Sequence, residues 1–165
     1  MRHPKPDPVR AGQESVWDYP RPPRVERVAA RVTVDLGGQR IVDTDDVVRV
    51  LETSHPPVYY LPVDAFVAGA LRPAAGSSWC EFKGQASYFD VVGGAVERPK
   101  AAWGYPSPSA GYADLIGRVA VYAGPMDACT LAGETVTPQP GGFYGGWVSA
   151  AIAGPFKGGP GSMGW

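Results

Sequence analysis

Trp79-Cys80-Glu81-Phe82-Lys83-Gly84-Gln85-Ala86-Ser87-Tyr88-Phe89-Asp90-Val91 is the stretch around which the rest of the chain is organised. Read with the two-residue period of a β-strand, Lys83 points to the same side as Trp79 and away from Cys80. Gly84-Gln85 interrupts the run, and strand-favouring residues resume after it. The stretch therefore predicts a β-hairpin with Lys83 at its shoulder, where a lysine between aromatic side chains suggests a pocket wall.

The composition favours an all-β fold. A chain of 165 residues is the size of one domain. Glycine and proline contribute 22 and 18 residues, which together are about a quarter of the chain and roughly twice their average usage. Because 44% of the residues are hydrophobic, this excess indicates many turns between short strands rather than disorder.

Charge and cysteine usage restrict the partners and the compartment. The net charge is −1 and no basic block is present, so we expect no nucleic-acid partner. No run reaches the ~18 apolar residues of a membrane span, and residues 1–6 lack the apolar core of a signal peptide. We therefore expect a cytoplasmic protein without a membrane partner, in which Cys80 and Cys129 are reduced and buried.

Three parts follow one another along the chain. Residues 1–25 form an N-terminal arm and a proline-rich strap, for which Trp17 and Tyr19 supply anchors. Residues 26–137 form the β domain. Residues 138–165 are rich in glycine and aromatic side chains, and we expect an ordered segment that wraps around the β core or a partner subunit. The sequence thus allows a homodimer. It also allows the alternative that the strap and the tail are protein–protein interaction surfaces.

Alternation of apolar and polar residues predicts most elements of the β domain. Residues 25–36 read as one half-buried strand, which the hairpin turn Gly37-Gly38 joins to a second strand. One short helix is expected at residues 64–71, with Asp64 near its N-terminus. The remaining strands are expected at 39–42, 47–51, 58–61, 96–102 and 117–122, with a last ribbon at 129–136.

The residues that could bind a metal or attack a substrate are scattered. His3, His55, Cys80 and Cys129 lie far apart in the sequence, so we expect no metal and no cofactor. Cys80 could act as a nucleophile if His55 or Lys83 activated it. The alternating pattern turns Cys80 away from Lys83, which favours a buried and inert thiol.

Four motifs follow one another in the β domain, namely Glu52-Thr53 before Pro57-x-Tyr59-Tyr60-x-Pro62, Cys80-x-x-Lys83-Gly84-x-Ala86-x-Tyr88, Ala102-Trp103-x-Tyr105 and Ile116-Gly117-x-Val119-Ala120. Together they resemble a known family, the domain of unknown function 427. The resemblance covers residues 26–136, and the strap and the tail resemble the actinobacterial long form. It departs at Glu81-Phe82, where the family tends to have Pro-Trp.

The resemblance implies a β-tent (Mss4-like) fold, in which two antiparallel sheets meet over a ligand-binding cleft. The zinc knuckles of its fold relatives are absent from this sequence, and a shared fold does not transfer a function. The family also carries a nucleotidyltransferase label. Gly37-Gly38 followed by Asp43-Thr44-Asp45 imitates the glycine turn and magnesium-binding aspartates of such enzymes, but we expect both in hairpin turns.

Aromatic walls with a few polar groups are typical of small-molecule sites. The candidate ligand-binding residues are Arg24, Tyr60, Lys83, Tyr88, Trp103 and Tyr105. They lead us to expect a small, partly planar ligand. An alternative is an enzyme in which Glu52 is the base and Lys83 stabilises charge. Two further interpretations are a Glu52–Lys83 ion pair without chemistry and a surface lysine packed on Phe82 or Tyr88.

Overall fold

The fold is all-β. The computed structural model describes residues 3–165 and contains fifteen short strands and three single 3-10 turns in that range. The 3-10 turns are η1 (Val16–Asp18), η2 (Val63–Ala65) and η3 (Ala113–Leu115). Within the described residues, no helix is long and apolar enough to cross a membrane.

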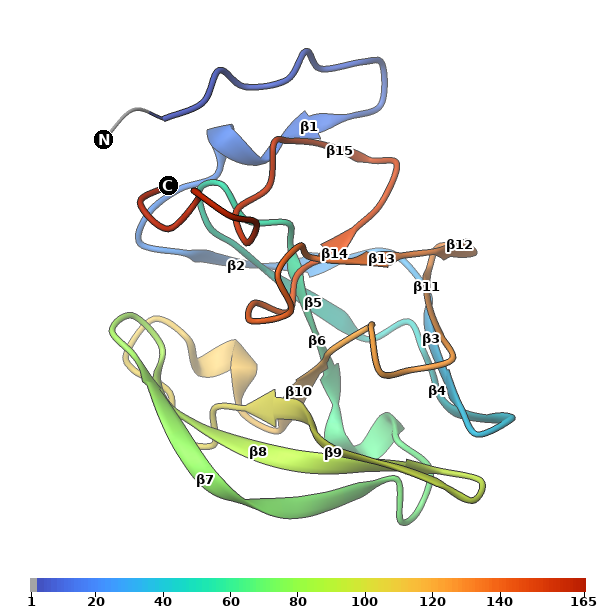
Figure 1. The fold of residues 1–165 in the computed structure, drawn as a ribbon. Helices are drawn as coiled ribbons and strands as arrows, with labels where there is room; N and C mark the ends of the chain where they lie inside the picture. The colour runs from blue at the N-terminus through green and yellow to red at the C-terminus, as the bar shows by residue number, and fades with distance from the viewer. Residues whose placement is uncertain (1–2) are drawn as a thin grey trace.

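Two antiparallel sheets build the centre of the molecule (Figure 1). The larger one contains, in spatial order, β2 (Arg24–Val28), β5 (Val47–Leu51), β6 (Val58–Pro62), β10 (Arg118–Val121), β9 (Val96–Gly104), β8 (Gly84–Gly93) and β7 (Leu71–Cys80). The smaller one contains β12 (Glu134–Thr135), β11 (Ala128–Leu131), β3 (Val32–Leu36) and β4 (Gln39–Thr44).

Two short strand pairs fasten the ends of the chain. β1 (Glu14–Ser15) pairs in parallel with β15 (Ile152–Ala153), and β13 (Thr137–Pro138) pairs with β14 (Trp147–Val148). The N-terminal and C-terminal segments therefore lie together at one end of the molecule, opposite β7, β8 and β9 (Figure 1).

The predicted single strand at residues 25–36 is wrong. The structure divides it into β2 and β3, which belong to different sheets. The chain crosses from one sheet to the other at residues 29–31, and the alternation of apolar residues continues through this crossing. Gly37-Gly38 joins β3 to β4 as predicted, but Asp43 lies within β4, opposite Thr33, and not in a turn.

The predicted helix at residues 64–71 is also wrong. Only the 3-10 turn η2 forms there, and β7 begins at Leu71. The amide of Val67 donates to Ile41, and the carbonyl of Ala70 accepts from Val92. The backbone of this segment thus forms two isolated turns, closed by the amides of Phe66 and Ala70, and is otherwise bonded to neighbouring strands.

The main core lies between the two sheets. Val32, Val34 and Leu36 of β3 are fully buried in it, which agrees with the alternation in the sequence. Trp147 of the C-terminal segment belongs to the same core and is 1% exposed. The predicted burial of Cys129 is confirmed, and burial together with nearby Asp35 raises the pKa of its thiol to about 12.

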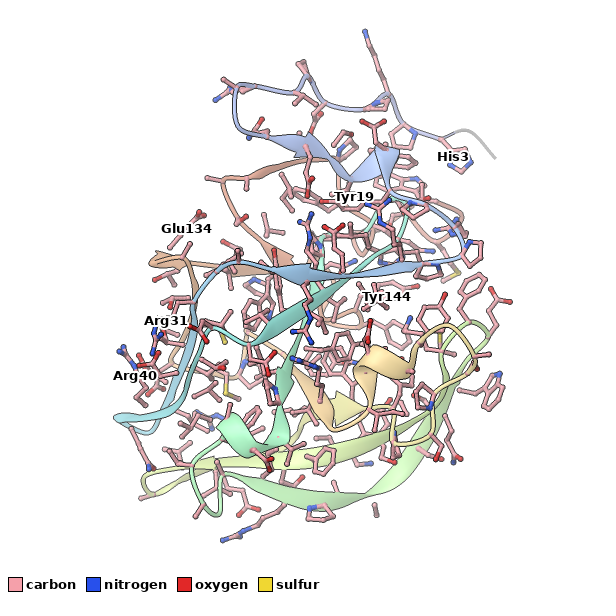
Figure 2. All side chains as sticks on the ribbon, turned by 180° about the vertical axis from the view of Figure 1, so that it is seen from behind. His3, Tyr19, Arg31, Arg40, Glu134 and Tyr144 are labelled. Carbon is pink, nitrogen blue, oxygen red and sulfur yellow. The ribbon has the colours of Figure 1, made fainter. Side chains whose placement is uncertain are left out.

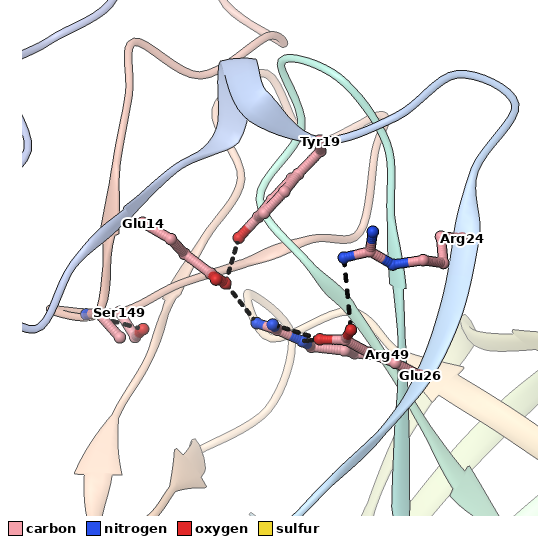
Figure 3. Close-up of polar contacts among 7 residues, drawn as sticks. Glu14, Tyr19, Arg24, Glu26, Arg49 and Ser149 are labelled. Carbon is pink, nitrogen blue, oxygen red and sulfur yellow. Dashed lines mark hydrogen bonds and ion pairs between the residues drawn. The ribbon is translucent and has the colours of Figure 1, made fainter.

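A charged network ties the N-terminal segment to the larger sheet (Figure 3). Arg49 of β5 lies between two carboxylates, with its Nη1 2.6 Å from Glu14 and its Nε 2.7 Å from Glu26. The hydroxyl of Tyr19 donates to Glu14 at 2.7 Å. Partial burial by itself raises the pKa of Glu14, but the bonds from Arg49 and Tyr19 outweigh it and hold that pKa below its ordinary value.

We expect Arg49→Met to lower the free energy of unfolding by about 1–2 kcal/mol, because it leaves Glu14 and Glu26 facing each other without the shared cation. Urea unfolding at neutral pH measures the loss. The matched control is Arg31→Met, since the Arg31–Asp43 pair is exposed on the edge formed by the smaller sheet (Figure 2). An equal loss in the two variants would contradict a special role of the network.

Candidate functional site

The predicted β7–β8 hairpin is confirmed, but its turn lies elsewhere. Cys80 pairs with Gly84, so the turn consists of residues 81–83 and not of Gly84-Gln85. Turn residues do not follow the alternation of a strand. As a result Lys83 is only 8% exposed, whereas Trp79 is 74% exposed, so the prediction that both point to the same side is wrong.

Lys83 lies against buried aromatic side chains. Its Nζ is 5.6 Å from the centroid of the Tyr105 ring, a distance at which the ring attracts a cation. Tyr105 packs against Tyr60 with ring centroids 6.4 Å apart, and Tyr60 meets the edge of Trp103 at 6.5 Å. All four residues are buried. We call Tyr60, Lys83, Trp103 and Tyr105 the lysine–aromatic cluster.

The ammonium of Lys83 has no anionic neighbour in direct contact. Among the residues that the structure describes, it forms neither an ion pair nor a hydrogen bond. The backbone carbonyl of Lys83 does accept a bond from Ser109 at 2.9 Å, which holds the turn in place. The surface-lysine interpretation is therefore wrong, and the side chain is a buried cation in an aromatic environment.

Two further side chains adjoin the cluster. Tyr88 is half-buried, and its hydroxyl is 2.8 Å from that of Ser78. Cys80 is half-buried and packs against the cluster, so its predicted full burial is wrong. Cys80 and Lys83 thus approach the same aromatic surface, although the alternation predicted opposite directions.

Burial keeps the cluster's hydroxyls protonated. It raises the pKa of Tyr60 well above the ordinary value, and Tyr105 adds to the effect. It also raises the pKa of Tyr105, with a smaller contribution from Cys80. At neutral pH the cluster therefore offers a cation and neutral phenols, without a negative charge of its own.

The other two predicted site residues have different partners. Arg24 of β2 is exposed and lies 3.4 Å from Glu26. Glu52 follows β5, forms an ion pair with Arg21 at 3.3 Å and lies 3.7 Å from the Nε2 of His55. The described residues contain no ion pair between Glu52 and Lys83, so the structure brings together the predicted aromatic residues and Lys83 but not Arg24.

His55 is a buried member of this region that the sequence did not single out as a ligand-binding residue. It is 7% exposed, its Nδ1 is 3.1 Å from the amide of Gln139, and the Tyr144 ring meets it edge-on at 4.7 Å. Burial, followed by the charges of Lys157, Arg21 and Lys83, lowers its pKa to about 3. The carboxylate of Glu52 favours the protonated form of His55, but that carboxylate already forms an ion pair with Arg21.

Its neighbour Ser54 has an unusual backbone. The φ angle of Ser54 is +72°, and its buried hydroxyl has no hydrogen-bond partner within the described residues. The turn Glu52-Thr53-Ser54-His55 before two prolines was visible in the sequence. Nothing local indicated that Gln139 and Tyr144, more than eighty residues away, would pack on it.

The loop between β13 and β14 lies on the aromatic residues. Gly145 is so close to Trp103 that a Cβ there would be 1.9 Å from the ring, so only glycine fits. Tyr122 stacks on Trp103 with centroids 4.6 Å apart, and its hydroxyl donates to the carbonyl of Phe143 at 3.1 Å. The C-terminal segment thus covers part of the cluster.

Metal ligands do not gather here. In residues 3–165, no three His, Cys, Asp or Glu side chains come close enough to share an ion. The chemical groups that the site offers are a buried ammonium, neutral phenols, one half-buried thiol and a neutral imidazole at neutral pH. Such a set can bind an anion and a flat ring.

The fold and the site define an all-β domain with a buried lysine–aromatic cluster. The family model described as "Domain of unknown function (DUF427)" matches residues 24–132. The chain belongs to this family. A search of the curated proteins gave no match.

Proposed function

We propose that the protein binds a small, partly planar and anionic ligand at the lysine–aromatic cluster. The observation that carries the proposal is Lys83, which is 8% exposed and whose ammonium faces the Tyr105 ring without a carboxylate partner among the described residues. A largely covered ammonium keeps only part of its hydration, so a counterion beside it would be favourable. An anionic ligand would supply the missing counterion.

The aromatic rings account for the planar part. Tyr60, Trp103 and Tyr105 pack against one another and are 1%, 8% and 6% exposed, so a planar ligand would meet only the parts of these rings that reach the surface beside Lys83. Small-molecule sites typically combine such walls with a few polar groups that set the ligand's orientation. Binding fits these residues better than acid–base chemistry by Glu52, since Arg21 already engages that carboxylate.

Three finer features belong to the same proposal. The two antiparallel sheets around one core are consistent with a β-tent (Mss4-like) arrangement. Ordered segments on both sides of residues 24–132 support the actinobacterial long form of the family. Two free cysteines support a reducing, cytoplasmic compartment.

The test compares the full chain with Lys83→Met, which keeps the length of the side chain but removes its charge. Each immobilised protein is incubated with a cellular small-molecule extract, and the retained compounds are identified by mass spectrometry. We expect the wild type to retain an anionic, planar compound, and Lys83→Met to retain on the order of tenfold less. Lys83→Arg, which preserves the charge, should be intermediate.

The matched control is Lys5→Met in the exposed N-terminal segment, which should bind like the wild type. Urea unfolding tests whether each variant is folded. Lys83→Met should stay within about 1 kcal/mol of the ligand-free wild type, because the ammonium makes no hydrogen bond or ion pair among the described residues that the change would break. Equal retention by Lys83→Met and the wild type would refute the proposed function.

A further inference from the structure

A cavity of about 710 Å³ lies between residues 122–125 and the C-terminal loop 138–146. Its volume is within the range of small-molecule sites. Lys83, Tyr60 and Tyr105 are not among its lining residues, so it is separate from the lysine–aromatic cluster. Tyr122 is in contact with both, because it lines the cavity and its ring packs at a tilt on Trp103.

The walls of the cavity are flat, largely apolar and held in place. Tyr122 and Tyr144 line it together with three prolines, Pro125, Pro138 and Pro140. Trp103 fixes the ring of Tyr122, and His55 fixes that of Tyr144. Aromatic side chains that are already fixed lose little entropy when a flat ligand packs on them.

The loop presents unpaired backbone donors. Residues 140–141 form a turn that the amide of Gly142 closes, and the amides of Gly141, Phe143, Tyr144 and Gly145 donate no hydrogen bond to another described residue. Four of these residues line the cavity, namely Gly141, Gly142, Tyr144 and Gly145. Three of the four are glycines, so a bound group can approach the amides without meeting a side chain. Successive free amides form a site for an anion.

Lys100 is the charged residue among those that line the cavity. Its backbone amide donates to Asp90 at 2.8 Å, and its Nζ lies near Gly76. A second cation, the Nζ of Lys157, lies 5.5 Å from the centroid of the Tyr144 ring and donates to the carbonyl oxygen of Trp165 at 3.2 Å. Water could accept hydrogen bonds from the amides, but it would gain nothing from the flat apolar walls. A ligand with an aromatic ring would use both.

We propose that this cavity is a second binding site, which takes a flat aromatic molecule that carries an acidic group. The aromatic body packs on Tyr122 and Tyr144, and the acid accepts hydrogen bonds from the free amides among residues 141–145. The two binding sites adjoin each other through Tyr122 and Gly145, which both contact Trp103, but the loop amides and Lys83 are different donors.

The test is calorimetric titration of the full chain with 2-naphthoate, its neutral analogue 2-naphthamide, and inorganic phosphate. We expect one molecule of 2-naphthoate to bind at the cavity, with a Kd of about 10–100 μM for a ligand of this size. The amide should bind about tenfold more weakly, because it lacks the charge that strengthens hydrogen bonds from the loop. Phosphate alone should show no measurable binding, because it cannot use the aromatic walls.

Gly124→Leu fills the cavity and should weaken 2-naphthoate binding at least about tenfold. Gly124 has no positive φ, and a Cβ there would meet its nearest neighbour, Pro138, at an ordinary 4.0 Å, so the variant should fold. The matched control is Gly159→Leu, where a Cβ meets nothing within 4 Å and which does not line the cavity.

Lys83→Met separates the two proposals. It should leave 2-naphthoate binding within about threefold of the wild type, because Lys83 does not line the cavity and supplies none of the loop amides. If Lys83→Met abolishes binding and Gly124→Leu does not, the probe occupies the lysine–aromatic cluster and the second site is refuted. Equal affinities for the acid and the amide would likewise refute it, whereas the extract experiment on Lys83 would be unaffected.

Discussion

Replacing Trp147 by alanine is expected to lower the free energy of unfolding by about 4 kcal/mol, the largest effect of any single change considered for this protein. Trp147 is 1% exposed and packs on Tyr59, with ring centroids 5.4 Å apart. Its Nε1 donates to the carbonyl of Val121 at 3.0 Å. The change leaves a cavity in the main core and removes the hydrogen bond to a buried acceptor.

Urea unfolding followed by circular dichroism measures this loss. The matched control is Trp79→Ala, because Trp79 is 74% exposed and should change stability by no more than about 0.5 kcal/mol. A loss of less than about 1 kcal/mol for Trp147→Ala would mean that the C-terminal segment is not part of the core.

The prediction bears on where the folded unit ends. Trp147 lies outside residues 24–132, the part of the chain that matches the family. Because it is buried among residues of both sheets, we expect the C-terminal segment to be needed for the full stability of the β domain. A chain shortened to residue 137 would expose the surface that Trp147 covers.

The second large effect is a loss of stability at mildly acidic pH that depends on His55. Its pKa is lowered from the ordinary 6.5 to about 3 in the folded protein, because the imidazole is buried and lies near Lys157, Arg21 and Lys83. Below pH 6.5 the unfolded chain binds a proton at this position and the folded chain does not. Stability is therefore complete above the unfolded pKa and falls as the pH drops below it.

Between about pH 7 and pH 5 this difference amounts to about 2 kcal/mol. Urea unfolding at both pH values measures it. His55→Gln removes the titrating group and should nearly abolish the dependence, even if it lowers stability at both pH values. The matched control, His3→Gln, should keep the full dependence. An undiminished pH dependence in His55→Gln would show that another group is responsible.

Much of the fold was predictable from the sequence because it depends on neighbouring residues. The alternation in residues 32–36 gave the buried face of β3, and Gly37-Gly38 gave the turn that follows. The aromatic residues and glycines around Lys83 gave the β7–β8 hairpin. In each case a two-residue period or a glycine turn is enough, since successive side chains of a strand point to opposite faces.

The errors arose where distant segments decide the local structure. Residues 25–36 keep their alternation although they form two strands, because each strand pairs with a different sheet. The sequence predicts a helix at residues 64–71 with Asp64 near its N-terminus, but hydrogen bonds with Ile41 and Val92 hold the segment against strands. Local periodicity does not reveal which partner supplies a backbone hydrogen bond.

The sequence by itself thus determined the all-β class, the hairpin and the kinds of side chain at the site. Only the tertiary structure decided that Lys83 turns inward onto Tyr105 and that Glu52 pairs with Arg21. It also decided that a glycine loop from the C-terminal segment covers Trp103. The physical reason is that the direction of a turn residue and the partner of a charge depend on packing between segments distant in the chain, which no local pattern encodes.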